Sequence, residues 1–214
     1  MIDYIFRLMP AMISGLDTTL SVFSLTLIFS IPLGVLVALG RLSNIKPLQA
    51  LLHLYIWVMR GTPLLLQIVF VFFGLPIVGI TFDRFPAAMI AFIFNYAAYF
   101  GEIFRGGIDS IDKGQYDAAK VLGFNTVQTY TKIILPQMIK IVLPSVANEV
   151  ITLVKDTALV YVVGLGELLR AGKIASNRDA SLVPLVMVGV FYLVLTAVLT
   201  AIFKKLEDRY SYYQ

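Results

Sequence analysis

The sequence predicts an all-α integral membrane protein with about five transmembrane helices, and three observations support that prediction. Apolar residues make up 59% of the 214-residue chain and charged residues only 14%, whereas soluble domains hold roughly 45 to 50% apolar and 25% charged residues. The mean hydropathy is +0.86. Apolar runs of about twenty residues, the length that crosses the hydrocarbon core as a helix, recur along the chain. We therefore expect residues 1–214 to form a single membrane domain.

Five segments are long enough to span the bilayer, and an odd number places the two termini on opposite sides. The expected spans are residues 15–40, 52–78, 85–106, 138–164 and 182–203. If the N-terminus is outside and the C-terminus is cytoplasmic, the inner segments hold ten basic residues: Arg41, Lys46, Arg105, Lys113, Lys120, Lys132, Lys140, Lys204, Lys205 and Arg209. The outer segments hold five: Arg7, Arg84, Arg170, Lys173 and Arg178. This asymmetry satisfies the positive-inside rule and predicts that orientation.

The second span is expected to open locally at "RGTP", residues 60–63. Pro63 has no backbone N–H and frees the carbonyl of Met59, while Gly61 permits close approach of a neighbour. Discontinuous helices of transporters commonly line substrate sites. Arg60 and Gly61 are therefore candidate substrate-binding residues, with Arg60 meeting a carboxylate. The alternative, that Arg60 reaches toward the membrane interface, stays open.

The third span carries polar residues with two interpretations. Asn95 and Tyr99 are one turn apart and either face a shared cavity, as candidate substrate-binding residues, or form a hydrogen bond between helices. Glu102 and Arg105, three residues apart near the inner end, are expected to form an ion pair.

The fourth span has a polar stripe in an apolar helix. Glu149, Thr152 and Asp156 lie on one face at 100° per residue, and ionisable residues inside membranes usually serve function. Glu149 and Asp156 are candidates for binding a substrate ammonium group, and Lys155 and Thr157 for binding a carboxylate. In the alternative, Lys155 pairs with a nearby acid only to neutralise the helix bundle.

A water-facing helix-turn-helix is expected in the connection between spans three and four, residues 107–137. Residues 109–122 are expected to form one amphipathic helix that ends at Gly123, which suits a left-handed position. Asn125 or Thr126 then caps a second helix.

This connection carries a family resemblance. Asp117-Ala118-Ala119, three residues, Gly123, nine residues and then Ile133-x-Leu135-Pro136 resembles E-A-A-x3-G-x9-I-x-L-P, the EAA loop of ABC importer permeases, with aspartate in place of glutamate. In that family the loop is the coupling helix that docks on the ATPase. The resemblance thus implies that Asp117, Ala118, Ala119 and Gly123 couple the chain to ATP hydrolysis. "RGTPLLLQ", "AYFGEIFRGGI" and "NEVITLVKDTALV" look like segments of the polar amino-acid uptake permeases.

The resemblance implies a type I importer permease in the bacterial inner membrane that moves a polar or charged amino acid into the cytoplasm. Its implied partners are two ATPase subunits, a second permease copy or close homologue, and an extracytoplasmic amino-acid-binding protein. The chain has no G-x-x-x-x-G-K-[ST] loop, so we expect a non-catalytic subunit without a cofactor, with ATP and Mg²⁺ on the partner. A passive channel or membrane scaffold remains the alternative.

Other site classes are disfavoured by composition. With no cysteine and a single histidine, His53, the chain lacks the residues for a histidine or thiolate metal site or for the usual hydrolase sets. The net charge of +4 is explained by the loop asymmetry, so no nucleic-acid partner is expected.

Overall fold

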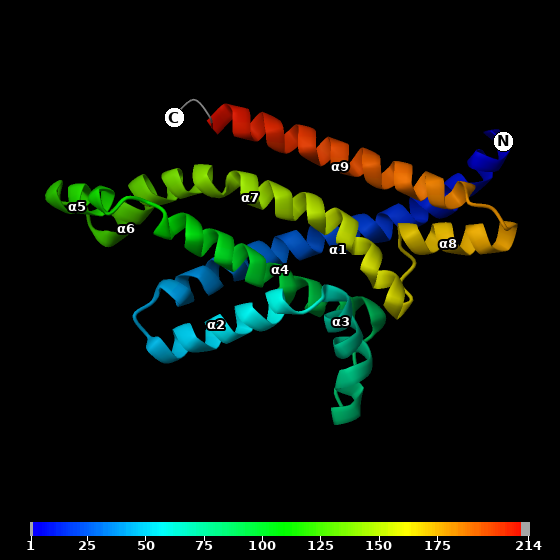
Figure 1. The fold of residues 1–214 in the computed structure, drawn as a ribbon, viewed down its shortest axis with the longest axis horizontal. Helices are drawn as coiled ribbons and strands as arrows, with labels where there is room; N and C mark the ends of the chain where they lie inside the picture. The colour runs from blue at the N-terminus through cyan, green and yellow to red at the C-terminus, as the bar shows by residue number, and fades with distance from the viewer. Residues whose placement is uncertain (1, 211–214) are drawn as a thin grey trace.

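The computed structural model describes residues 2–210, and those residues form helices joined by short turns (Figure 1). In chain order the elements are α1 (Ile2–Leu42), α2 (Lys46–Gly61), α3 (Leu64–Val69), η1 (Phe70–Gly74), η2 (Leu75–Val78), α4 (Arg84–Asp109), α5 (Lys113–Val121), α6 (Thr126–Thr129), η3 (Tyr130–Ile134), α7 (Leu135–Asp156), η4 (Thr157–Val163), α8 (Leu168–Asp179) and α9 (Val183–Tyr210). The predicted all-α membrane class is confirmed.

Within residues 2–210, four helical stretches are long and apolar enough to cross a membrane, and a bent pair supplies a fifth span if its halves count as one. The four stretches are Ile2–Leu42, Arg84–Asp109, Thr126–Val163 and Val183–Tyr210. The bent pair joins Lys46–Gly61 to Leu64–Val78 at 105°. The first helix is longer than the expected span, because it begins at Ile2 and continues through residues 2–14, which are mostly apolar but include Asp3 and Arg7.

Helix α4 lies at the centre of the bundle and packs most extensively against α1. The side chains of Phe92, Tyr96 and Phe100 on α4 are fully buried in the main core. The two helices approach closely at Gly34, where an added Cβ would lie 3.1 Å from the backbone nitrogen of Gly101. Glycine therefore fixes the distance between α1 and the helix that carries part of the site.

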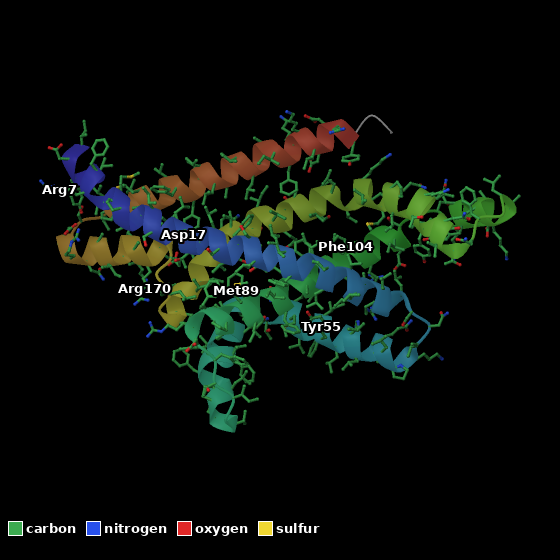
Figure 2. The ribbon with its side chains drawn as sticks, turned by 180° about the vertical axis from the view of Figure 1, so that it is seen from behind. Arg7, Asp17, Tyr55, Met89, Phe104 and Arg170 are labelled. Carbon is green, nitrogen blue, oxygen red and sulfur yellow. The ribbon has the colours of Figure 1, made fainter. Side chains whose placement is uncertain are left out.

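The molecule is elongated, and its two ends differ. Figure 1 shows α5, α6 and the α1–α2 turn at one end, and the N-terminus with α8 at the other. Arg7 and Arg170, two of the predicted outer basic residues, lie at the α8 end in Figure 2. The predicted coupling segment thus lies at the end opposite these arginines.

Polar contacts fix the α8 end. The carboxylate of Glu167 is buried and accepts hydrogen bonds from the backbone N–H groups of Leu169 and Arg170, each at 2.6 Å. Burial raises the pKa of Glu167, and these backbone bonds act in the opposite direction. The Tyr4 hydroxyl donates to Asp179 at 2.7 Å, and hydrogen bonds from Arg178 and Tyr4 lower the pKa of Asp179 to about 2. The carboxylates thereby cap α8 and tie it to the start of α1.

Candidate functional site

The site is built around the break between α2 and α3. Helix α2 ends at Gly61, and the backbone is extended at Thr62 and Pro63 before α3 begins at Leu64. Because the break bends the chain by 105°, the segment from Leu64 to Val78 projects away from the bundle (Figure 1). The predicted opening at residues 60–63 is confirmed, although it is a sharp elbow within what we expected to be one continuous span.

Two side-chain amides replace the backbone hydrogen bonds lost at the elbow. The carbonyl oxygen of Met59, freed by Pro63 as predicted, accepts from Nε2 of Gln67 and from Nδ2 of Asn95, both at 2.9 Å. Nδ2 of Asn95 also donates to Oε1 of Gln67 at 3.1 Å. Asn95 is 4% exposed, so its amide nitrogen serves the helix-to-helix bond that was one of its two interpretations.

Beside the elbow lies a cavity of about 590 Å³, which we call the cargo cavity. Its lining comes from the end of α2, the elbow, the start of α3, the middle of α4, the end of α7 and the start of η4. The lining residues are Arg60, Gly61, Thr62, Pro63, Leu64, Leu65, Asn95, Tyr96, Tyr99, Glu149, Thr152, Asp156 and Leu159. The structure therefore brings together five predicted site residues from three separate spans: Arg60, Gly61, Asn95, Glu149 and Asp156.

The charged groups of the cargo cavity are two carboxylates and one guanidinium, those of Glu149, Asp156 and Arg60. Oδ2 of Asp156 accepts a hydrogen bond from the Tyr96 hydroxyl at 2.8 Å. The guanidinium of Arg60 lies over the ring of Tyr99, 5.1 Å from its centroid, and interacts electrostatically with Glu149. The cavity thus offers fixed negative charge together with one cationic group.

Two predicted site residues lie elsewhere. The hydroxyl of Thr157 is buried and donates to the carbonyl of Val154 at 2.7 Å, and neither Thr157 nor Lys155 lines the cargo cavity. Lys155 and Thr157 flank Asp156 in the sequence, and at about 100° per residue both point away from the face that Glu149, Thr152 and Asp156 share. From Thr157 the backbone continues as the 3₁₀ segment η4.

Lys155 interacts electrostatically with Asp156, as the neutralising alternative expects, but without a direct salt bridge. Within residues 2–210, Lys155 makes no ion pair with Glu149 or Asp156; the ion pairs there join Arg105 to Glu102 and Asp109, and Arg178 to Asp179. The expected pair between Glu102 and Arg105 is therefore confirmed, whereas Lys155 is exposed.

Two residues that support the site were not predicted from the sequence: Tyr96, which lines the cargo cavity, and Gln67, which lies at the elbow. Tyr96 orients Asp156, and Gln67 completes the elbow. Both stand in apolar surroundings in the sequence. A polar side chain four residues after the helix-breaking Pro63, and eight after the carbonyl that this proline frees, is the signal that finds Gln67.

The predicted coupling segment forms two short helices around a tight turn. Gly123 has φ +75°, the left-handed conformation predicted for it. Asn125 caps α6, because its side chain accepts from the N–H of Gln128 while Gln128 bonds back to the N–H of Asn125. The expectation of one helix over residues 109–122 is wrong: α4 ends at Asp109, and Asp112 accepts from the N–H of Gly114 to start α5 afresh.

The coupling residues divide between two faces of this segment. Ala119 is fully buried against the protein body, whereas Asp117, Ala118 and Gly123 are exposed. Val121, Leu122 and Val127 are 88%, 69% and 71% exposed. Exposed apolar side chains on a segment away from the spans indicate a protein contact surface, which we call the coupling face.

No group of three or more metal-ligating side chains lies together within residues 2–210.

Comparison with known proteins agrees with this geometry. The family described as binding-protein-dependent transport system inner membrane component matches residues 30–212. The arginine transport system permease protein ArtQ of Bacillus subtilis (strain 168) is 40% identical over 202 residues, covering 94% of this chain and 92% of the relative. The L-cystine transport system permease protein TcyB of the same organism is 34% identical over 206 residues, covering 95% and 88%.

Solved structures show the same arrangement. An amino acid ABC transporter crystallised with histidines matches with a TM-score of 0.89 at 34% identity, covering 96% of this chain and 97% of the other. An inward-facing form of the MetNI methionine ABC transporter matches with a TM-score of 0.77 at 20% identity, covering 95% and 98%, and supports the fold alone.

Proposed function

Because the chain belongs to the family of inner membrane components of binding-protein-dependent transport systems, we propose that it is the permease subunit of an ABC importer for a basic amino acid. Relatives named as arginine, glutamine and L-cystine permeases cover nearly its whole length. It is thus a multi-pass protein of the inner membrane and follows the type I importer permease fold of its structural neighbours.

The observation that supports a basic cargo is the charge of the cargo cavity. A basic amino acid carries one carboxylate and two cationic groups, and the cavity holds one guanidinium, from Arg60, and two carboxylates, from Glu149 and Asp156. Each cargo charge loses water on entry and needs an opposite partner. A neutral amino acid leaves one of these carboxylates unpaired.

The coupling face supports an ATPase partner. Its apolar side chains, Val121, Leu122 and Val127, are exposed beside the Asp117–Gly123 motif. An apolar patch rimmed by charge suits a groove on another protein. We infer that two ATPase subunits bind two permease copies here, that ATP and Mg²⁺ stay on the ATPase, and that this chain performs no catalysis.

The remaining assignments are further parts of this proposal. An extracytoplasmic binding protein delivers cargo to the α8 end, and the N-terminus is outside while the C-terminus is cytoplasmic. The basic residues at the α8 end are fewer than those near α5 and α6, in agreement with the positive-inside rule.

Reconstitution tests the function. The chain, its ATPase and its binding protein are placed in liposomes, and uptake of labelled arginine is measured with and without ATP. We expect ATP-dependent uptake that excess arginine or lysine competes out and that glutamine and glutamate compete poorly. Equal flux without ATP supports the channel alternative, and efficient competition by glutamate overturns the basic cargo.

A further inference from the structure

A second cavity adjoins the cargo cavity at Arg60. It measures about 400 Å³ and is lined by Arg41, Trp57 and Glu102, among others. It shares Arg60, Gly61 and Tyr99 with the cargo cavity. Since Arg41 is in the last turn of α1, this cavity lies toward the α1–α2 turn, at the same end as the coupling face (Figure 1).

Arg60 and Tyr99, which line both cavities, contact each other. The guanidinium carbon lies 5.1 Å from the ring centroid, a cation–π geometry. Arg60 interacts electrostatically with Glu149 in the cargo cavity and with Glu102 in the second cavity. Among residues 2–210, no hydrogen bond or salt bridge holds the Arg60 guanidinium in place, and its direct contact at this point is with the Tyr99 ring.

The two cavities have opposite charge. The cargo cavity holds two carboxylates for one guanidinium. In the second cavity the carboxylate of Glu102 is already bound by Arg105, while the guanidiniums of Arg60 and Arg41 are present. Nη1 of Arg41 donates to the carbonyl of Gln49 at 3.2 Å, and its buried Nε has no partner within residues 2–210. A basic amino acid that moves inward therefore loses its carboxylate partners and meets positive charge.

We propose that Arg60 and Tyr99 form the inner gate of the cargo cavity, and that the second cavity is a release chamber for the basic amino acid. The inference rests on the proposed function. Arg60 keeps the cargo carboxylate during the passage, because it faces both cavities. The positive chamber then lowers the affinity for the cationic groups, which favours departure to the cytoplasm and opposes return.

Truncation of the ring tests the gate. Tyr99→Ala removes the cation–π contact, and Tyr99→Phe keeps it. The complex with its ATPase and binding protein is placed in liposomes loaded with labelled arginine, and leak without ATP is divided by the ATP-driven uptake of the same variant. We expect this ratio to rise roughly five- to thirtyfold in Y99A and to stay within about twofold of wild type in Y99F. Equal ratios in Y99A, Y99F and wild type overturn the gate.

A second pair of variants tests the chamber and does not depend on Tyr99. Arg41→Gln removes its positive charge, and Arg41→Lys preserves it. Arginine on the ATPase side of the membrane is expected to inhibit ATP-driven uptake by occupying the chamber. We expect the arginine concentration that halves uptake to be lower in R41Q than in wild type by roughly threefold or more. The half-inhibiting concentration in R41K should stay near that of wild type, and an unchanged half-inhibiting concentration in R41Q overturns the release chamber.

The failure of this inference can be distinguished from failure of the proposed function. Absence of ATP-driven uptake in wild type overturns the proposed function itself, whereas intact wild-type uptake with no change in Y99A and R41Q overturns only this inference.

Discussion

Asp156 shows how one buried hydroxyl sets the geometry of a cavity carboxylate. The Tyr96 hydroxyl, on a ring that is 2% exposed, donates to Oδ2 of Asp156 at 2.8 Å. No other hydrogen bond to this carboxylate is made within residues 2–210. One oxygen is thus oriented by the protein, and the other remains for a ligand.

Removing the charge of Asp156 should weaken transport more than removing its orienting bond. A charge-assisted hydrogen bond contributes about 1.5 to 3 kcal/mol, so Asp156→Asn or Glu149→Gln should raise the half-saturating concentration for uptake by roughly one to two decades. Tyr96→Phe keeps the carboxylate charge and should raise it by roughly fivefold. Assembly with the ATPase is the control. Wild-type saturation by both D156N and E149Q would remove these acids from the site.

Glycine is required at position 123 for the left-handed backbone conformation and not for the absence of a side chain. Its φ is +75°, and an added Cβ would meet nothing within 4 Å. Replacement therefore acts through strain of the turn between α5 and α6, which costs about 1 to 2 kcal/mol for most residues.

We expect Gly123→Val to reduce stimulation of ATP hydrolysis by cargo while insertion and folding persist. Gly123→Asn is the matched control, because asparagine tolerates the left-handed region. The measurement is ATPase activity of the reconstituted complex with and without cargo. Normal coupling in G123V would be inconsistent with the role assigned to this turn.

At the scale of elements, the elbow depends on side chains from two helices. Met59 keeps a satisfied carbonyl because Gln67, on α3, and Asn95, on α4, both donate to it. The angle between α2 and α3 is thus fixed by hydrogen bonds to α4 in addition to packing.

Gln67→Leu should destabilise the elbow, since it removes one donor to Met59 and the acceptor for Asn95. Because Asn95 still donates to the Met59 carbonyl, the expected loss is about 0.5 to 1.5 kcal/mol, the range for a single hydrogen bond. Gln67→Glu separates hydrogen bonding from packing, because it keeps the shape and loses the donor. Thermal unfolding in detergent is the measurement, and a higher melting temperature for Q67L than for wild type would argue for a packing role alone.

The elements that sequence predicted well are those whose causes are local. The free carbonyl before Pro63, the left-handed Gly123 and the cap at Asn125 each depend on residues within about four positions. The helix over residues 109–122 was wrong because Asp112 competes for a backbone N–H two residues ahead. Thr157 was predicted as a ligand for its hydroxyl, and the sequence does not show that this hydroxyl is used by the carbonyl of Val154.

The cargo cavity could be predicted in composition but not in shape. Polar residues inside apolar spans identified Arg60, Asn95, Glu149 and Asp156 separately. Their meeting depends on a 105° bend and on helix crossings such as that at Gly34, which arise from tertiary contacts.

At the scale of the whole molecule, the separation of the two ends makes orientation testable with single cysteines. The natural chain has no cysteine, so one introduced thiol reports alone. Asn177 on α8 and Lys120 on α5 are both exposed and lie at opposite ends.

Asn177→Cys should react with a membrane-impermeant maleimide in intact cells, and Lys120→Cys should react only after the membrane is permeabilised. The expectation follows from the excess of basic residues at the α5 end. The reverse pattern would place the coupling face outside, away from any cytoplasmic ATPase.

The elbow also has a consequence for how the chain is made. Gln67 follows Met59 by eight residues, whereas Asn95 follows it by 36. As the polypeptide leaves the ribosome, the freed carbonyl can therefore pair with Gln67 well before α4 is synthesised. The bend is then completed only when the next span arrives beside it, so the biosynthetic insertion of α4 is the step that locks the preceding pair of helices.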